Sequence, residues 1–335
     1  MPDLSQFSVL VAGCGSIGRR HLKNLRELGV RQLGVCDPDA ERSAPVVKEL
    51  GVAAFLDLGD ALRAQKPDAV FVCTPPVQHV ALAMQALAAG VHVFIEKPLS
   101  HDWQGVEELL QAATQRGRTV QVGYNLRFHP GLRKLKEMVQ GGRLGRILWA
   151  YAEAGQYLPD WRPWQDYRQS YTARRALGGG ILLDGSHELD YLTWLLGTPM
   201  EVMCMAGRVG ALEVDVEDCA DLLLRFRGGA QAQVHLDFVQ RGYARTCKVV
   251  GERGTACWDF TGREVRVFSA ESNGWESFAY DFEPNDMYVA EIEHFFECIS
   301  SGQSPAVGLC QAADTLKLVL AAKSAAEHRR AESLA

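Results

Sequence analysis

A glycine-rich turn directly behind an apolar run is the feature that most constrains how this chain folds. The run covers residues 9–12, and a stretch of helical composition follows the turn. The turn consists of Gly13, Cys14, Gly15, Ser16, Ile17 and Gly18. Three glycines at this spacing allow a sharp turn, a close approach of backbone N–H groups to a pyrophosphate, and tight packing of the next helix. The pattern therefore predicts a dinucleotide site.

An acidic residue follows the second apolar run, where a dinucleotide site requires a carboxylate for the ribose. The second apolar run, 33–36, ends in Asp37, 19 residues beyond Gly18, and a carboxylate there accepts hydrogen bonds from an adenosine ribose. The same carboxylate repels a 2′-phosphate, and Pro38 and Asp39 supply no cation to offset this repulsion, although Arg42, one turn further on, could reach back. We therefore predict NAD as the cofactor, in preference to NADP.

Five apolar runs in the first third of the chain alternate with helical patterns. The runs are 9–12, 33–36, 69–73, 91–95 and 119–122, and the helical stretches include 80–89 and 103–116. Continuous apolar runs indicate strands that are buried on both faces, and hence a parallel sheet covered by helices. Residues 1–123 are therefore predicted to form a doubly wound Rossmann domain that binds NAD.

The alternation of apolar runs with helical patterns ends after residue 123. Apolar and polar residues alternate over 231–238, which is typical of a strand with one buried face. Further strands are expected at 147–151, 201–209, 220–226, 246–250, 256–260 and 265–268, and helices at 287–300 and 309–328. Residues 124–335 are predicted to form an α+β domain for substrate binding and oligomerisation, with a large open, mostly antiparallel sheet. Its polar face carries Gln, His and Asp, so we expect that face to meet another subunit.

Composition and charge exclude several other classes of protein. The 335 residues carry a net charge of −6 without a dense basic cluster, which argues against nucleic acid as a partner. Nine cysteines without a C-x-x-C pair indicate reduced thiols rather than a zinc site, and no metal is expected. Residues 1–9 do not resemble a signal sequence, and no apolar stretch is long enough to span a membrane. A cytoplasmic protein is therefore predicted.

Two turns follow strand ends of the predicted parallel sheet. They are Thr74 and Pro75 after one strand, and Glu96, Lys97 and Pro98 after the next. Ligands bind at the carboxyl ends of parallel strands. A lysine there can hydrogen-bond a hydroxyl or carbonyl oxygen and favour negative charge that develops during hydride transfer, while the proline fixes the turn. We predict that Lys97 has this role; the alternative is a solvated loop lysine.

A second group of polar residues follows three consecutive glycines, 178–180. On a continuous helix Asp184, His187 and Asp190 fall at i, i+3 and i+6, so His187 has a carboxylate within reach. Oxidising a secondary alcohol needs a base for the hydroxyl proton, and histidine titrates in the suitable range. We predict that His187 is this base; the alternative is a helix-start histidine bonded to backbone.

Aromatic and basic residues are interleaved over 157–175, including Trp164, Tyr171 and Arg174. Aromatic rings cover the C–H faces of a sugar, and arginine suits a phosphate or carboxylate. The segment therefore predicts a loop that binds a sugar with an anionic group. The alternative is a loop that only packs between the domains and binds no substrate.

Together these motifs resemble the glucose-fructose oxidoreductase, myo-inositol dehydrogenase and MocA family (Gfo/Idh/MocA). The similarity rests on the glycine turn, the Glu96-Lys97-Pro98 turn and the segments 123–130 and 178–190, and it spans nearly the whole chain. The resemblance implies a Rossmann domain followed by an α+β domain with an open sheet. It also implies an active site between them, and homodimers or homotetramers built through the sheet.

The resemblance assigns roles to single residues. Lys97 matches the catalytic lysine, His187 the catalytic histidine, Asp184 the preceding acid, and Glu96 a group near the nicotinamide ribose. In much of the family the acid precedes the histidine by four residues, whereas here it precedes it by three. Relatives often have a cis peptide before the motif proline, so a cis Lys97–Pro98 bond is predicted.

These considerations give a full set of expected contacts. The expected cofactor contacts are Gly13, Gly15, Ser16, Ile17, Gly18, Asp37, Thr74, Pro75, His79, Glu96, Lys97 and Arg127. The expected substrate contacts are Lys97, Asn125, Arg127, Trp164, Tyr171, Arg174 and His187. The predicted function is NAD-dependent hydride transfer to or from a secondary alcohol or ketone of a sugar phosphate, a nucleotide sugar or a sialic-acid-like sugar. The alternatives are a glycosidase that uses transient oxidation and a catalytically silent NAD-sensing regulator.

Overall fold

The computed structural model describes residues 2–334, and contacts within it divide the chain into two compact units. The first unit comprises Met1–Asn125 and Pro284–Ala313, and the second comprises Leu126–Glu283 and Asp314–Ala335. The sequence predicts one C-terminal domain over 124–335. In the structure residues 284–313 instead pack with the N-terminal unit.

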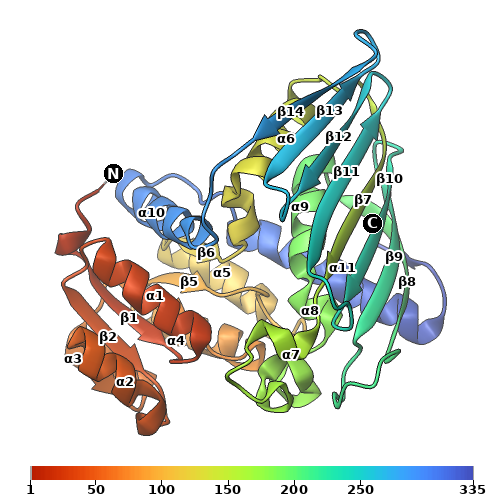
Figure 1. Cartoon of the computed structure of the whole chain (residues 1–335). Helices are drawn as coiled ribbons and strands as arrows, with labels where there is room; N and C mark the ends of the chain where they lie inside the picture. Colours follow the sequence, from red (N-terminus) through yellow and green to blue (C-terminus); the bar gives the residue numbers. More distant parts are fainter. Residues whose placement is uncertain (1, 335) are drawn as a thin grey trace. The chain divides into compact units, whose positions relative to one another are not determined.

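The first unit is built on a six-stranded parallel sheet in the order β3-β2-β1-β4-β5-β6 (Figure 1). Its strands are β1 (Ser8–Ala12), β2 (Gln32–Cys36), β3 (Ala53–Phe55), β4 (Ala69–Val72), β5 (His92–Ile95) and β6 (Val120–Val122). Its helices are α1 (Ser16–Glu27), α2 (Ala40–Leu50), α3 (Leu58–Gln65), α4 (His79–Ala88), α5 (Val106–Arg116) and α10 (Asp286–Ser301). This is the doubly wound Rossmann order that the sequence predicts, and chain order reverses between β1 and β4.

The returning segment completes the core of the first unit. Phe295 and Phe296 on α10 are fully buried against Phe71 and Phe94 of β4 and β5, with ring centroids 4.7–6.3 Å apart among the four. The backbone N–H of Val122 donates to the Val307 carbonyl oxygen at 3.0 Å. Apolar burial of this size explains why α10 packs against the parallel sheet.

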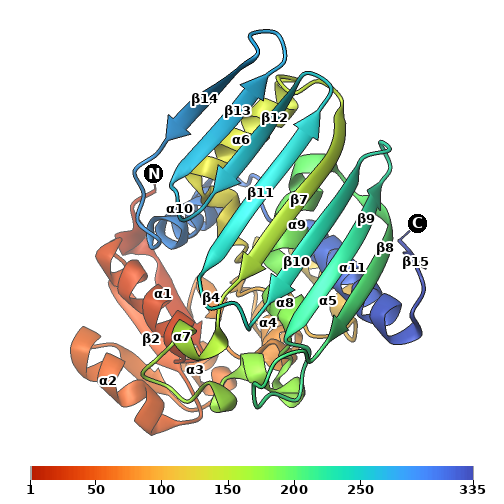
Figure 2. The same cartoon turned by 45° about the vertical axis from the view of Figure 1, so that its right-hand side comes forward.

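The second unit is built on a nine-stranded sheet in the order β14-β13-β12-β11-β7-β10-β9-β8-β15 (Figure 2). Its strands are β7 (Ile147–Gly155), β8 (Pro199–Gly207), β9 (Cys219–Phe226), β10 (Gln231–Asp237), β11 (Ala244–Gly251), β12 (Gly254–Asp259), β13 (Glu264–Ser269), β14 (Gly274–Ala279) and β15 (Glu332–Ser333). All neighbouring strands pair antiparallel except β7 and β10, which are parallel. The predicted mostly antiparallel sheet is therefore confirmed.

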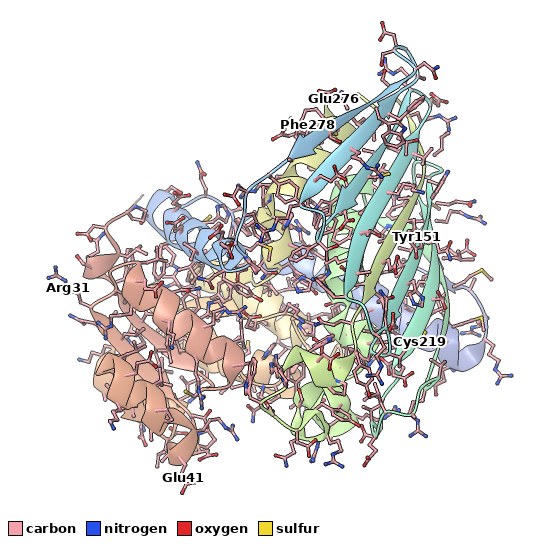
Figure 3. All side chains as sticks on the ribbon, in the orientation of Figure 1. Arg31, Glu41, Tyr151, Cys219, Glu276 and Phe278 are labelled. Carbon is pink, nitrogen blue, oxygen red and sulfur yellow. The ribbon has the colours of Figure 1, made fainter. Side chains whose placement is uncertain are left out.

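Helices cover one face of this sheet and leave the other exposed. The helices of this unit are α6 (Pro130–Gln140), α7 (Leu158–Trp161), α8 (Ile181–Asp184), α9 (Ser186–Leu196) and α11 (Leu309–His328), the last beginning in the first unit; α6, α8 and α9 contact strands of the sheet. On β10, Ala232, Val234 and Leu236 are buried while Gln231 and Gln233 are exposed, as the alternation predicts. Tyr151 on β7 and Cys219 on β9, labelled in Figure 3, are half-buried. Within residues 2–334, no helix has the length and apolarity that crossing a membrane requires.

Candidate active site

The glycine turn of the first unit has the geometry of a phosphate cradle. At Gly13, φ is +98° and a Cβ atom would lie 2.6 Å from the Cys73 carbonyl oxygen, so a larger residue does not fit. At Gly18 a Cβ atom would lie 2.0 Å from the Gly13 carbonyl oxygen, which lets α1 pack closely against the turn. At Gly15, by contrast, no described atom lies within 4 Å of that position, so the backbone is open to a ligand.

The start of α1 completes this cradle. Ser16 is the first helical residue and is exposed, while Ile17 packs against the hydrophobic core of the unit. The N-terminus of a helix of this length offers N–H groups and a positive dipole to an anion. The residues present thus fit the pyrophosphate of a dinucleotide.

Asp37 at the end of β2 is fixed by backbone groups. One of its carboxylate oxygens accepts from the Cys14 N–H at 2.8 Å, and the other accepts from the Asp39 N–H at 3.0 Å. The Arg42 guanidinium lies 3.6 Å from this second oxygen. Each carboxylate oxygen has two lone pairs, so both keep the capacity to accept from a ribose hydroxyl. These bonds fix the orientation of the carboxylate, and its contact with a ribose stays a prediction.

The turn after β4 is linked to the turn after β5 by a buried histidine. The two ring nitrogens of His79 lie 2.8 Å from the carbonyl oxygens of Thr74 and Pro98, and its side chain is 1% exposed. Burial lowers the pKa of His79, although the two carbonyl groups oppose this effect. These contacts favour a positioning role for His79, which links the turns that bear Thr74, Pro75 and Lys97.

Glu96 and Lys97 lie in the turn that follows β5. The Nε2 atom of His21 lies 2.6 Å from one carboxylate oxygen of Glu96, and the Lys97 N–H donates to the other at 3.3 Å. Glu96 is 7% exposed, whereas Lys97 is half-buried. The Lys97–Pro98 peptide is cis, as predicted. Glu96 is thus bonded to the backbone of the residue that carries the predicted catalytic amine.

In the second unit, Asp184 and His187 do not share one continuous helix. Asp184 ends α8, Gly185 interrupts the helix, and His187 lies in the first turn of α9. The helical i, i+3 spacing predicted for this pair is therefore wrong, because a second helix begins after Gly185. Asp184 is 6% exposed and accepts a hydrogen bond from the Tyr171 hydroxyl at 2.9 Å. His187 is 9% exposed.

Arg127 and Asp190 form a buried, bidentate ion pair in the second unit. Nε and Nη2 of Arg127 donate to the two carboxylate oxygens at 2.8 and 2.7 Å, and the Thr315 hydroxyl donates at 3.3 Å. Burial raises the pKa of Asp190, while Arg127 opposes this shift. The pair ties the segment before α6 to α9, three residues beyond His187. Arg127 was predicted to contact cofactor and substrate, which stays a prediction; the structure shows it bonded to Asp190 on the helix that carries His187.

The three glycines before α8 allow two segments to approach closely. A Cβ atom at Gly179 would lie 2.3 Å from the Tyr171 carbonyl oxygen. At Gly180, φ is +114° and a Cβ atom would lie 2.4 Å from a carboxylate oxygen of Glu217, whose carbonyl also accepts from the Ile181 N–H. The glycines thus bring Tyr171 to the position from which it bonds Asp184.

The predicted substrate loop consists of short helical turns. Trp164 is 78% exposed and Arg174 is exposed, with its Nε donating to the Arg168 carbonyl oxygen at 2.8 Å. Tyr171 is half-buried against Asp184. Asn125, predicted to contact substrate, is 4% exposed at the end of the first unit's N-terminal segment.

The predicted site residues thus fall into two groups. The cofactor half-site, in the first unit, contains Gly13, Gly15, Ser16, Ile17, Gly18, Asp37, Thr74, Pro75, His79, Glu96, Lys97 and Asn125. The histidine half-site, in the second unit, contains Arg127, Trp164, Tyr171, Arg174, Asp184 and His187. Sequence reasoning missed His21, although it follows the glycine turn by three residues, and Asp190 as the partner of Arg127.

Comparisons with known proteins cover most of the chain. Residues 7–124 match the family described as "Oxidoreductase family, NAD-binding Rossmann fold", and residues 132–257 match the "GFO/IDH/MocA C-terminal domain". The myo-inositol 2-dehydrogenase of Thermotoga maritima is 29% identical over 341 residues, which is 97% of each chain.

Solved structures share the fold over nearly their full length. The UDP-N-acetylglucosamine 3-dehydrogenase of Acidithiobacillus ferrooxidans has a TM-score of 0.82 at 26% identity, over 96% of this chain and 98% of that chain. An oxidoreductase from Agrobacterium radiobacter, solved with NAD+, L-tartaric acid and magnesium, has a TM-score of 0.85 at 20% identity over 98% of each.

Proposed function

Since the chain belongs to the GFO/IDH/MocA family of NAD-binding oxidoreductases, we propose that it oxidises a secondary alcohol of a sugar or cyclitol derivative, or reduces the matching ketone. NAD supplies the acceptor or donor of hydride at nicotinamide C4. The glycine turn holds its pyrophosphate and Asp37 its adenosine ribose, while Thr74, Pro75 and Glu96 serve the nicotinamide end. The observation that carries the proposal is the Glu96 and Lys97 turn at the carboxyl end of β5, beside that cradle.

In the oxidising direction the two half-sites act on one alcohol. His187 removes the hydroxyl proton as the C–H bond gives up its hydride, and Lys97 donates a hydrogen bond to the same oxygen, which becomes the ketone oxygen. Asp184, bonded to Tyr171, orients the histidine end of the site. In the reducing direction His187 returns the proton to the carbonyl oxygen.

The substrate is a polyol with an anionic group. Relatives named for inositol and for UDP-N-acetylglucosamine support a ring with several hydroxyl groups. The exposed Trp164 and Arg174 on the loop support stacking on a sugar face and pairing with a phosphate or carboxylate.

A substrate panel tests this proposal. Purified protein with NAD+ and each of myo-inositol, UDP-N-acetylglucosamine and a sugar phosphate is followed by the absorbance of NADH. We expect at least one compound to give net NADH, and Lys97→Met to abolish it while exposed Lys48→Met does not. Cleavage of a glycoside without net NADH would instead support the transient-oxidation hydrolase, and NAD binding without any turnover would support a regulator.

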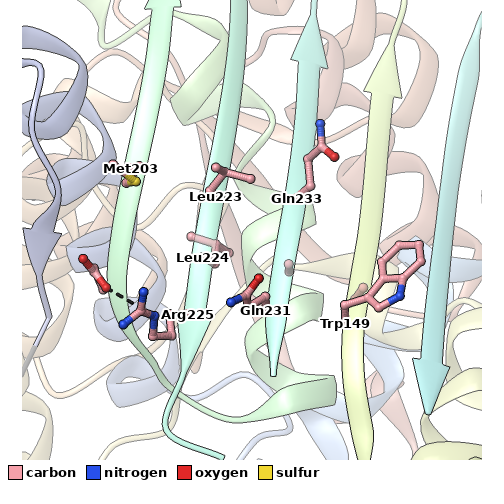
Figure 4. A pocket seen from close by; sticks show the side chains of 10 residues that line it. Trp149, Met203, Leu223, Leu224, Arg225, Gln231 and Gln233 are labelled. Carbon is pink, nitrogen blue, oxygen red and sulfur yellow. Dashed lines mark ion pairs between the residues drawn. The ribbon is translucent and has the colours of Figure 1, made fainter. Parts of the chain in front are cut away.

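We also propose that the exposed face of the nine-stranded sheet pairs with a second copy of the chain. Trp149, Met203 and Leu223 are 43%, 51% and 56% exposed and line a hollow on this face together with Arg225 and Gln231 (Figure 4). Apolar side chains gathered this way are characteristic of subunit interfaces. Light scattering should give an oligomeric mass that Leu223→Glu reduces and that Leu56→Glu, at an equally exposed leucine of the first unit, does not. A monomeric wild type would refute this assembly.

A further inference from the structure

A buried cluster of three ionisable side chains lies behind the Lys97 turn, entirely within the first unit. His21 on α1 and Glu291 on α10 are 0% exposed, and Glu96 is 7% exposed. One side-chain N or O atom of each lies within 4.8 Å of the others. Both carboxylate oxygens of Glu291 are buried and have no hydrogen-bond partner among residues 2–334. A native protein retains such groups rarely, since leaving a buried polar atom unsatisfied is costly.

The spacing within the cluster fits a shared proton better than a metal ion. His21 Nε2 and Glu96 Oε1 are 2.6 Å apart, which is the length of a strong charge-assisted hydrogen bond. Two tetrahedral ligands about 2.0–2.1 Å from zinc would lie roughly 3.3 Å from each other. His21 Nδ1 is buried without a partner among the described residues. Among the described residues, the ring therefore contacts the cluster through Nε2 alone.

The location of the negative charge follows from the donors. Glu96 accepts from His21 and from the Lys97 N–H, and donors of this kind favour the ionised form of a carboxyl group. Glu291 has no such donor, and burial together with the nearby Glu96 raises its pKa well above the usual value. Two buried carboxylates this close do not both ionise, because their repulsion adds to the cost of desolvation.

The side chains that surround the cluster are mainly aromatic. The His21 ring packs against Phe71, Phe94 and Tyr288, with centroids 5.2–6.2 Å apart. The titratable and charged groups around the cluster are Arg20 on α1, Tyr288 on α10, Cys73 after β4, and Lys97 in its turn. The Arg20 guanidinium lies over the Tyr288 ring, 4.4 Å from its centroid. Burial raises the pKa of both Cys73 and Tyr288, so both groups are neutral near pH 7.

We propose that Glu291 is a positioning residue that keeps one proton in this cluster, so that Glu96 carries the charge of the pair and orients the Lys97 turn. The neutral Glu291 leaves both Glu96 oxygens to His21 and to the Lys97 backbone. Removal of its proton places a second charge beside Glu96. The pair then relaxes by loosening these bonds or by drawing the proton of His21 onto Glu96. Either change disturbs the turn that carries the catalytic amine.

Unfolding without any ligand tests the proton itself. Because the folded pKa of Glu291 is raised, the folded protein holds a proton that the unfolded chain releases above about pH 4.5, so stability falls as pH rises until the folded pKa is reached. The unfolding equilibrium constant of the wild type should rise by up to tenfold per pH unit relative to Glu291→Gln, and relative to Glu291→Met. Exposed Glu297→Gln on the same helix should follow the wild type. Parallel profiles for wild type and both Glu291 variants would overturn the proposal.

Cofactor binding tests the positioning role, which rests on the proposed function. The dissociation constant of NAD+ is measured against pH up to the alkaline limit at which the protein stays folded. At pH 7 Glu291→Gln should bind within about twofold of the wild type, because the amide keeps the neutral group in place. At alkaline pH the wild-type constant should rise by up to tenfold per pH unit while that of Glu291→Gln stays level. Superimposed profiles would overturn the role of Glu291, whereas a wild type that does not bind NAD+ at pH 7 would overturn the proposed function instead.

Discussion

The cofactor half-site and the histidine half-site are oriented by different kinds of contact. In the cofactor half-site the functional groups lie on turns at strand ends, and backbone N–H and carbonyl groups hold Asp37 and His79. Glu96 accepts from one backbone N–H and also contacts the His21 side chain. In the histidine half-site the groups lie on and beside helices, and other side chains hold them, as Tyr171 does for Asp184. Turns off a parallel sheet are dictated by local sequence, whereas side-chain pairs depend on segments that are distant in the chain.

The difference predicts how each half-site responds to substitution. A backbone-held group tolerates changes in its neighbours' side chains, provided that the glycines and prolines remain. A group held by side chains depends on each partner separately.

The largest expected effect is on the chemical step. Lys97→Met and His187→Asn should each lower kcat by about 10²–10⁴-fold, the range for a lost general acid–base or oxyanion-stabilising group. The dissociation constant of NAD+ should change by less than about threefold, because neither side chain holds the pyrophosphate. Single-turnover kinetics and fluorescence titration measure the two quantities. Equal losses in both would assign a structural role to the substituted residue.

The next effect is on the stability of the histidine half-site. Arg127→Met leaves the Asp190 carboxylate buried without its bidentate partner, so the free energy of unfolding should fall by about 3–5 kcal/mol. Arg146→Met is the matched control, because Arg146 pairs with Glu252 at 2.7 Å with both side chains about half exposed. Arg146→Met should lower the free energy of unfolding by about 0–1 kcal/mol. Similar losses for both variants in urea unfolding would contradict the importance of side-chain pairing here.

A smaller decrease in the free energy of unfolding is expected for a substitution at the glycines before α8. Gly180→Ala places a Cβ atom 2.4 Å from Glu217 at a φ of +114°, and strain of this kind costs about 1–3 kcal/mol. Gly228→Ala, where nothing described lies within 4 Å and φ is not positive, should be neutral or slightly stabilising. Thermal unfolding measures both. An unchanged midpoint for Gly180→Ala would show that Glu217 moves aside freely.

The smallest effect near neutral pH concerns the start of the second unit, and it grows only on acidification. Burial among aromatic rings lowers the pKa of His129 to about 3. The unfolded chain therefore binds a proton below about pH 6.5 that the folded protein excludes, and stability falls on acidification by up to about 1.4 kcal/mol per pH unit until pH 3. His129→Asn keeps a side-chain cap for α6 and should flatten this part of the profile. An equally steep profile in the variant would refute this origin.

The local sequence was sufficient to predict the turns and strand ends of the cofactor half-site. The glycine turn, the strand ends that carry Thr74 and Glu96, and Asp37 after β2 follow from apolar runs and glycine spacing, both of which act over a few residues. The cis Lys97–Pro98 bond came from the family resemblance and is confirmed. Short edge strands were missed, because Gly274–Ala279 is largely exposed and Ala53–Phe55 has only three residues. Neither strand has the buried, alternating pattern that indicates a strand.

Contacts between distant segments could not be predicted in this way. The return of 284–313 to the first unit depends on where Phe295 and Phe296 find an apolar partner, which no local pattern specifies. The break at Gly185 separates Asp184 from His187 although the spacing suggested one helix. An acidic residue among the apolar positions of α10, Glu291, was the available signal for the buried cluster.

A double-mutant cycle tests most directly whether Lys97 and His187 act on the same reacting oxygen. The rate of the hydride-transfer step is compared in Lys97→Met, in His187→Asn and in the double variant. Groups that act as one unit give strongly non-additive losses, so the double variant should be little slower than the slower single variant. Losses that multiply to the product of the two single effects would contradict a shared site.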